Sequence, residues 1–318
     1  MKQNYSIGVD LGGTNIKFGI ANEKGKISKK IVLPTKAEKG PESVISQILK
    51  GINSILDKSK DEIKGIGIGA PGTVISAKGT VEHPPNFPDW GKVHLGKIVS
   101  KKTNLSVQVE NDANAAAIGE LIYGAGKKLN DFLMVTLGTG VGGGIIFNKQ
   151  LYRGSHGAAG EIGHISINHN GRKCKCGSRG CVETYIGNKY LISNVKKQLL
   201  RHRDSLIYKM IEGNNSLLSP KLISEAAEQH DDFAISIIVN AGQSLGYGIS
   251  SVINVLDITN VIIGGGVAGF GEILFRSIES TIQRRVMKPF RDKIKILPAG
   301  LKNEAGIKGA AALVFYKS

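Results

Sequence analysis

The stretch that decides the fold lies near the start of the chain and reads SIGVDLGGTNIKFGI over residues 6–20. An apolar run ends at Asp10, a glycine-rich turn occupies 12–15, and a second apolar run begins at Ile16. Glycine adopts the backbone conformations that tight turns require, so the pattern predicts a strand, a turn and a second strand. Glycines also let backbone N–H groups approach phosphate oxygens, and Thr adds a hydroxyl donor. The stretch therefore predicts a phosphate-binding turn, preceded by a carboxylate that can hold the water shell of Mg²⁺.

Two further glycine turns follow apolar runs: TLGTG at 136–140 and three glycines at 264–266. Both match the G-x-G-x-x-G spacing of dinucleotide-binding proteins, which by itself is a weak signal. The run after the first match, 145–149, predicts a strand and hairpin instead of a crossover helix, and the second match lacks an acidic residue at the usual distance. Together the three turns describe a cleft for ATP, with two turns for phosphates and one for the nucleoside.

Strands alternate with helical patterns along the chain, which predicts an α/β protein, and 318 residues suggest two domains. The amphipathic run 41–57 and the run from 111 to about 123 predict helices. The stretch 76–95 is rich in Pro, Asn, His and Gly, and it predicts a surface loop.

Charge and composition limit the classes of function. The chain carries 42 basic and 26 acidic residues, a net charge of +16, but the basic residues occur as scattered pairs. We interpret them as a solvated surface that favours anionic small substrates, not as a nucleic-acid interface. No apolar stretch approaches the ~18 residues of a membrane span, and no signal-peptide pattern precedes Asp10. We therefore expect a cytoplasmic protein that binds neither nucleic acid nor membrane.

All cysteines of the chain fall in one short segment, at Cys174, Cys176 and Cys181. An odd, clustered set argues against a disulfide framework and for a local metal site. Three thiols and one imidazole make a complete tetrahedral Zn²⁺ set, for which the chemistry admits either His164 or His169. A site with four protein ligands has no open position, so the zinc should be structural.

The segment VENDANA, residues 109–115, places Asp112 where a strand is expected to give way to a helix. An Asp at such a junction often caps the helix. The same carboxylate is suited to accept the proton of a hydroxyl group that attacks a phosphate. The residues alone leave both roles open.

These motifs resemble those of the ROK family (repressors, open reading frames and sugar kinases), within the superfamily of actin-like ATPases and hexokinases. The resemblance runs from Asp10 to the final helix and is closest to the bacterial glucokinases of the family. It implies a two-lobed actin-like ATPase (ribonuclease H-like) fold with an interlobe cleft. The smaller α/β lobe would comprise 1–112 with about 303–318, and the larger α/β lobe 113–302 with the zinc loop at 164–181.

The resemblance also implies roles for individual residues. Asp112 is then the catalytic base, and His164 is the fourth zinc ligand beside the cysteines. The implied sugar site consists of Asn86, Asn111, Asp112, Glu161, His164 and Glu183. The implied site for ATP and Mg²⁺ consists of Asp10, Gly12, Gly13, Thr14, Asn15, Lys17, Thr139, Gly140, Gly264, Gly265 and Gly266.

The expected function is ATP-dependent phosphorylation of a hexose at the 6-hydroxyl, with glucose converted to glucose 6-phosphate. An N-acetylhexosamine or fructose remains an alternative acceptor and polyphosphate an alternative donor, because side-chain directions in 76–95 and 150–160 do not follow from sequence. A more remote alternative is a non-catalytic sugar-binding regulator of the ROK family. A repressor would need a DNA-binding helix-turn-helix before the first strand, and because the first turn begins at about residue 10 we expect no such domain. We expect a homodimer or homotetramer.

Overall fold

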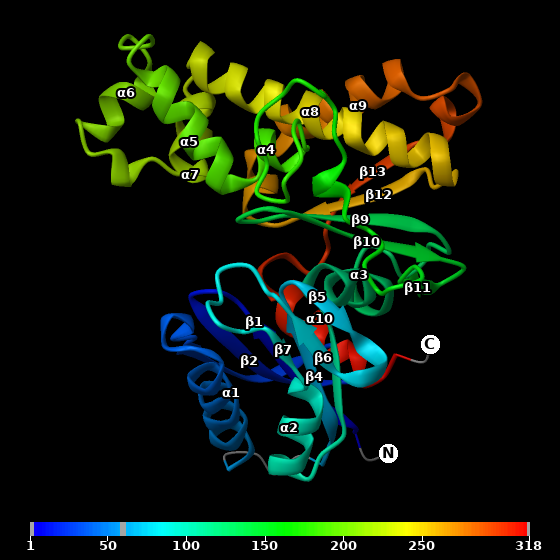
Figure 1. The fold of residues 1–318 in the computed structure, drawn as a ribbon. Coiled ribbons are helices and arrows are strands. Elements are labelled where there is room, and N and C mark those ends of the chain that lie inside the picture. The colour runs from blue at the N-terminus through cyan, green and yellow to red at the C-terminus, as the bar shows by residue number, and fades with distance from the viewer. Residues whose placement is uncertain (1–2, 58–61, 317–318) are drawn as a thin grey trace. The chain divides into compact units, whose positions relative to one another are not determined.

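The computed structural model describes residues 3–57 and 62–316 (Figure 1). Contacts between residues divide the chain into two compact units. The first unit comprises Met1–Met134, Gly144–Gly160 and Ala299–Ser318, and the second comprises Val135–Gly143 and Glu161–Pro298. Both contain strands and helices, as the alternating sequence pattern predicts.

A five-stranded sheet with the order β3-β2-β1-β4-β8 forms the centre of the first unit. Its strands are β1 (Tyr5–Leu11), β2 (Asn15–Asn22), β3 (Ile27–Pro34), β4 (Ile63–Ala70) and β8 (Val107–Asn111). β1 and β2 pair antiparallel around the first glycine turn, which confirms the expected strand–turn–strand. β4 and β8 run parallel to β1, so Asp10 and Asn111, each near a strand's carboxyl end, lie at the same edge.

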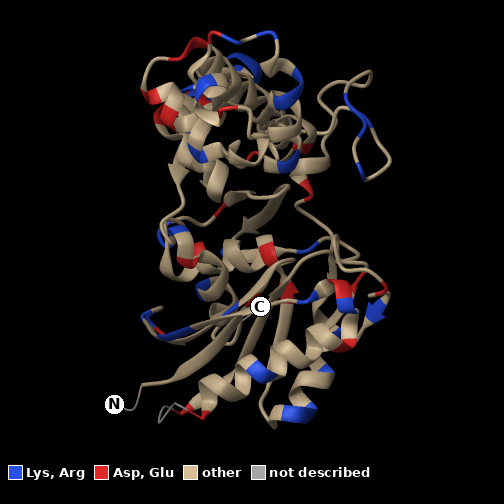
Figure 2. Cartoon of the chain, turned by 90° about the vertical axis from the view of Figure 1, so that its left-hand side faces the viewer, with Lys and Arg blue, Asp and Glu red and all other residues tan. Residues whose placement is uncertain are grey.

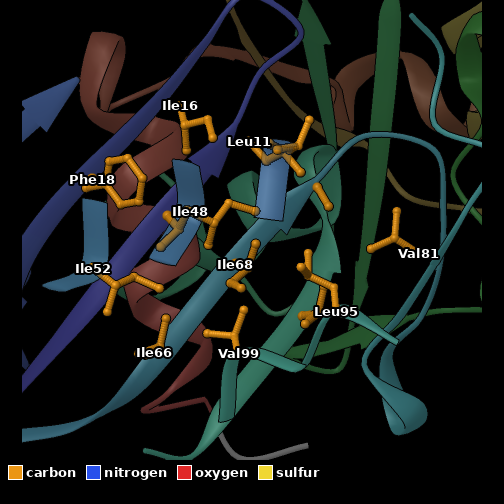
Figure 3. Packing of buried hydrophobic residues seen from close by; sticks show 14 of the residues in the cluster. Leu11, Ile16, Phe18, Ile48, Ile52, Ile66, Ile68, Val81, Leu95 and Val99 are labelled. Carbon is orange, nitrogen blue, oxygen red and sulfur yellow. The ribbon is translucent and has the colours of Figure 1, made fainter. Parts of the chain in front are cut away.

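Helices cover both faces of this sheet. On one face, α1 (Pro41–Leu56) and α2 (Leu95–Thr103) bury Ile48 and Val99 against Phe18 and Ile68 of the strands (Figure 3). The 41–57 pattern thus predicts α1 correctly, because its apolar residues recur at helical spacing.

The other face of the sheet is made of glycine where helix α10 (Ala305–Leu313) lies against it. A Cβ added to Gly67 would lie 1.8 Å from the carbonyl oxygen of Ala310, and one added to Gly8 would lie 2.1 Å from that of Ile307. Any side chain at these two positions would push the helix away. Helix α3 (Asp112–Tyr123) packs against α10, where Gly119 and Gly309 allow a similarly close approach.

The expectation of a surface loop over 76–95 is correct for 83–91, which hold no strand or helix, and wrong for the residues on either side. The stretch contains β6 (Thr80–Glu82) and β7 (Lys92–Val93), which form a small sheet with β5 (Thr73–Ile75). Trp90 is buried, and its Nε1 donates a hydrogen bond to the Val81 carbonyl at 3.3 Å. Apolar residues spaced between Pro and Gly supply a core that the composition conceals.

A second five-stranded sheet has the order β11-β10-β9-β12-β13. Its strands are β9 (Phe132–Leu137), β10 (Val141–Phe147), β11 (Gln150–Tyr152), β12 (Asn260–Gly264) and β13 (Lys295–Pro298). β10 and β11 form the antiparallel hairpin predicted after the 136–140 turn, which excludes a dinucleotide-binding unit there.

The second unit carries the remaining α-helices of the described chain. They are α4 (Glu183–Ile186), α5 (Asn188–Leu199), α6 (Leu206–Ile211), α7 (Pro220–Glu228), α8 (Asp232–Leu256) and α9 (Gly271–Arg285). α8 and α9 lie along each other, and glycine makes this possible: a Cβ added to Gly242 would lie 2.7 Å from Ser277.

No helix in the described ranges combines the length and the apolar character that crossing a membrane requires. Lys and Arg lie among Asp and Glu in both units instead of forming one continuous stripe (Figure 2).

Candidate active site

The glycine turn between β1 and β2 is shaped by hydrogen bonds within the first unit. The N–H of Gly12 donates to the Asn15 carbonyl at 3.1 Å, and the hydroxyl of buried Thr35 donates to the Gly12 carbonyl at 2.6 Å. The Thr35 N–H donates to the Thr14 carbonyl at 2.9 Å. Gly13, Thr14 and Asn15 themselves are exposed. The turn therefore has a defined shape and presents its tip to solvent, as a phosphate-binding turn requires.

Asp10 lies just before this turn and faces Lys17 on the neighbouring strand, with 3.6 Å between Lys17 Nζ and Asp10 Oδ2. The first turn of α10 also lies against it, since a Cβ added to Gly306 would be 2.3 Å from Asp10 Oδ2. Burial raises the pKa of Asp10, and Lys17 only partly opposes this effect. A partly buried carboxylate with a raised pKa gains from a further cation, so Asp10 fits the part of a Mg²⁺ ligand.

The junction between β8 and α3 distinguishes the two roles open to Asp112. The Asn111 side chain, not that of Asp112, is the N-cap, because Asn111 Oδ1 accepts hydrogen bonds from the N–H groups of Ala113 and Asn114 at 2.9 and 3.2 Å. Asp112 is the first residue of the helix, and its Oδ1 also accepts a hydrogen bond from the Ala113 N–H at 2.8 Å. The N-cap position therefore belongs to Asn111, and Asp112 lies in the first turn of the helix.

The segment that carries Asn86 lies close to both features. Asn86 has a left-handed backbone, with φ 67°, and a Cβ added to Gly13 would lie 4.0 Å from the Asn86 Cβ. The Gly72 carbonyl accepts a hydrogen bond from Asn111 Nδ2 at 3.1 Å, and a Cβ on Gly72 would lie 2.6 Å from Pro84. The first unit thus gathers Asp10, its glycine turn, Asn86 and the start of α3 at one sheet edge.

In the second unit, the 136–140 turn is tied to Glu183 and to the start of α5. Glu183 Oε2 accepts a hydrogen bond from the Val141 N–H at 3.0 Å, and a Cβ added to Gly140 would lie 2.2 Å from the same oxygen. The N–H groups of Asn188 and Lys189 donate to the carbonyls of Gly138 and Thr139 at 3.1 and 3.2 Å. One predicted sugar residue and one predicted phosphate turn therefore form a single structural unit.

Two adjoining cavities of about 360 and 430 Å³ lie next to this turn within the second unit. Thr139 lines the smaller cavity, Glu225 and Glu228 line the larger one, and Lys221 and Gly266 line both. The predicted phosphate turn and the predicted adenosine turn therefore meet, and a Cβ at Gly265 would in fact lie 2.3 Å from the Leu137 carbonyl oxygen.

Sequence reasoning missed the residues that α5 and α7 contribute to these cavities. Asn188 lines the smaller cavity, and its buried Oδ1 has no hydrogen-bond partner within the described part of the chain. Lys221 follows Ser219 and Pro220, an N-cap and a first-turn proline that mark a helix start in the sequence. The signal for the helix was present, but its direction toward the glycine turns depends on the tertiary fold.

The predicted metal ligands converge. Ligand atoms of His164, Cys174, Cys176 and Cys181 all lie within 4.8 Å of one another. Cys174 Sγ is 3.7 Å from His164 Nδ1, and Cys176 Sγ is 3.6 Å from Cys181 Sγ. His169 instead contacts Asn170 at 3.0 Å. The fold therefore selects His164 over His169 as the fourth member of the cluster.

The electrostatics of this cluster fit a cation. Burial, together with the neighbouring thiols, raises the pKa of Cys181 to about 12, whereas a backbone hydrogen bond at Ser178 lowers that of Cys176. Thiols this close cannot all ionise without a positive charge among them, and three thiolates with one imidazole are the ligand set that Zn²⁺ prefers. The other ring nitrogen, His164 Nε2, lies 3.9 Å from Glu161 Oε2. A bound metal would thus orient an imidazole beside a predicted sugar ligand.

Comparisons with known proteins agree with this geometry. The ROK family model matches residues 6–317, and the chain belongs to the ROK family. It is 36% identical to a glucokinase of Thermotoga maritima over 97% of this chain and 96% of that one. It is also 31% identical to a xylose repressor of Caldicellulosiruptor bescii, with 97% of this chain matching 77% of the repressor.

A solved structure extends the likeness to three dimensions. The ROK family glucokinase of Streptomyces griseus, in complex with glucose and AMPPNP, superposes with a TM-score of 0.86 at 35% identity, covering 97% of this chain and 98% of that one. The predicted family and the two-lobed actin-like ATPase fold are thereby confirmed.

Proposed function

We propose that this chain transfers the γ-phosphoryl group of ATP to the 6-hydroxyl of a hexose, with glucose as the main acceptor. The β8–α3 junction carries the proposal: Asn111 is the N-cap, and the Asp112 carboxylate lies at the helix start, at the same sheet edge as Asp10 and the first glycine turn. The similarity to glucokinases over nearly the whole chain supports the substrate class.

In the proposed reaction, Asp112 accepts the proton of the sugar 6-hydroxyl. The hydroxyl oxygen of the sugar forms a bond to the γ-phosphorus while the bond between that phosphorus and ADP breaks. Glu161 and Glu183 accept hydrogen bonds from sugar hydroxyls and orient the acceptor, since carboxylates suit a polyol. With Nδ1 of His164 in the thiol cluster, its Nε2–H would donate to a sugar hydroxyl. Mg²⁺ at Asp10 would supply positive charge to the phosphates of the nucleotide. The glycine turns contribute backbone N–H groups to the same phosphates.

The cavities of the second unit support ATP over polyphosphate as the donor. Lys221 lies next to the glycine turns and suits phosphate, whereas Glu225 and Glu228 line the far cavity and would repel a polyanion. Carboxylates there suit ribose hydroxyls instead. Glu225→Gln should weaken ATP binding without strengthening glucose binding. If this variant preferred polyphosphate to ATP as the donor, the repulsion of polyphosphate by Glu225 would be confirmed.

The Cys–His cluster supports a structural Zn²⁺ with four protein ligands, which elemental analysis tests. We also propose lobe limits near 112 and 303, which limited proteolysis tests. We propose a homodimer or homotetramer, which light scattering tests.

The deciding experiment is a coupled assay of ADP formation with ATP and a panel of hexoses, including N-acetylhexosamines and fructose, with polyphosphate as a second donor. Turnover highest with glucose and ATP is expected. The likeness to a xylose repressor favours one second candidate, a sugar-binding regulator. Calorimetric sugar binding without turnover of any hexose would establish that candidate and reject the kinase.

A further inference from the structure

Glu110 lies directly before Asn111 and Asp112, and neither the motifs nor the comparisons assign it a role. It stands near the end of β8, paired with Gly69 of β4, and its side chain is only 3% exposed. A buried carboxylate needs partners for its charge and for its lone pairs, because burial without them is costly.

Four donors from three separate segments meet at this carboxylate. Oε1 accepts from the Asn111 N–H at 2.9 Å and from Asn114 Nδ2 at 3.2 Å. Oε2 accepts from the Ser76 hydroxyl at 2.8 Å and from Arg153 Nε at 2.9 Å. A carboxylate offers about four acceptor positions, so its hydrogen-bonding capacity is filled.

The partners of Glu110 lie in segments that surround the start of α3. Ser76 begins the short helical turn Ser76–Lys78 between β5 and β6. Arg153 begins a loop that closes on itself, with the Ala159 N–H donating to the Arg153 carbonyl at 3.1 Å. The same loop passes β5 closely, since a Cβ added to Gly157 would lie 3.1 Å from the Val74 carbonyl oxygen.

The chemistry of this cluster demands a carboxylate. The Arg153 guanidinium and the backbone N–H of Asn111 can only donate, and they bind different oxygens of Glu110, so a glutamine at 110 would turn its own NH₂ toward one of them. An aspartate would be one methylene too short to reach both loops. Burying such an ion pair adds little net stability, whereas it sets the geometry of the segments that it joins.

We propose that Glu110 is a positioning residue of the hexose kinase reaction: it holds the start of α3, and with it Asp112, in register with the Ser76 turn and the Arg153 loop. The inference rests on the proposed kinase function. Because proton transfer and in-line attack need their geometry within a fraction of an ångström, loss of the anchor should reduce turnover more than sugar binding.

Kinetics of Glu110→Gln, Arg153→Gln and Arg153→Lys test the inference. We expect Glu110→Gln to lower kcat roughly 100-fold, and Arg153→Gln roughly tenfold because three donors stay in place. Arg153→Lys should recover part of the loss, since it restores the charge. Glucose Kd, measured by calorimetry without ATP, should stay within about threefold of the wild-type value. In the double variant Glu110→Gln/Arg153→Gln, kcat should be no lower than in Glu110→Gln, because the clash of donors is relieved.

The matched control is Lys64→Gln, which removes an exposed ion pair with Glu62 in the same unit and should leave kcat and Kd unchanged. Thermal melts identify variants that fail to fold, and if Glu110→Gln is one of them, the two Arg153 variants decide, because Arg153 is 31% exposed. Folded variants with wild-type kcat would overturn the inference. So would a higher glucose Kd with unchanged kcat, which would make Arg153 a sugar contact. Absence of turnover in the wild type would reject the kinase itself and not this anchor.

Discussion

Different interactions order two regions that carry predicted site residues: the β8–α3 junction of the first unit and the 164–181 loop of the second. At the junction, Asn111 and Glu110 hold the helix start by hydrogen bonds, and Val109 and Ala113 anchor it in buried surroundings. The loop contains isolated bridges and backbone hydrogen bonds, such as that from the Ile167 N–H to the Gly180 carbonyl at 2.9 Å, but most of its side chains are exposed. A packed core and hydrogen bonds order the first region, whereas the second has hydrogen bonds and a thiol cluster but few buried side chains.

Asp112→Asn should produce the largest effect, a fall in kcat of about 10²–10⁴-fold without loss of stability, because Asn111 keeps the helix cap. A coupled assay and a thermal melt measure the two quantities. The matched control is Asp232→Asn, which changes the first residue of α8 behind its cap Asp231 and should leave kcat unchanged. Wild-type turnover in Asp112→Asn would reject the base.

Removal of zinc should loosen the loop and spare the junction. Cys176→Ser, or exhaustive chelation, should loosen the backbone at the exposed Lys173 and Lys175 so that trypsin cleaves there faster, and should raise the glucose KM about tenfold, a loss of roughly 1.4 kcal/mol. His169→Ala is the matched control, because His169 lies outside the cluster, and it should keep one zinc per chain. Freshly purified wild-type protein without zinc would contradict the assignment.

Asp10→Asn should separate activity from stability. Burial raises the pKa of Asp10, so the group favours folding at low pH, and this contribution is lost as pH rises through the raised pKa. At neutral pH without Mg²⁺ the variant should therefore melt no lower than the wild type, while its kcat falls. Mg²⁺ with ATP should raise the Tm of the wild type more than that of the variant. Equal shifts would show that Asp10 does not hold the metal.

The smallest effect should come from the surface ion pairs of Glu304. Hydrogen bonds from Lys30 and then Lys308 lower the pKa of Glu304, so its contribution to stability is present above the unfolded pKa and is lost as pH falls through the lowered one. The side chain is 34% exposed, so screening limits the effect of Glu304→Gln to about 0.2–1 kcal/mol at neutral pH. Denaturant melts at low and high salt measure it, and a larger, salt-independent loss would show that these ion pairs hold the start of α10 as strongly as buried contacts do.

The sequence predicted the features that depend on neighbours along the chain. The glycines after Asp10 predict the turn between β1 and β2, and the spacing of apolar residues over 41–57 predicts α1. The run 145–149 predicts the hairpin after the 136–140 turn. By contrast, the order in 76–95 was missed, because Val81 and Trp90 find their partners only when the small sheet forms. Residue composition alone does not predict such tertiary contacts.

The sequence by itself determined the types of polar group and their spacing along the chain: a carboxylate before a glycine turn, Asn and Asp at a helix start, and three thiols close together. Only the tertiary structure decided which of these groups meet. It selected His164 over His169, joined the turn at Thr139 to Gly266 and Lys221, and gathered Ser76 and Arg153 on Glu110. The physical reason is distance along the chain: turns and caps form between neighbouring residues, whereas these contacts form only after the hydrophobic cores have packed.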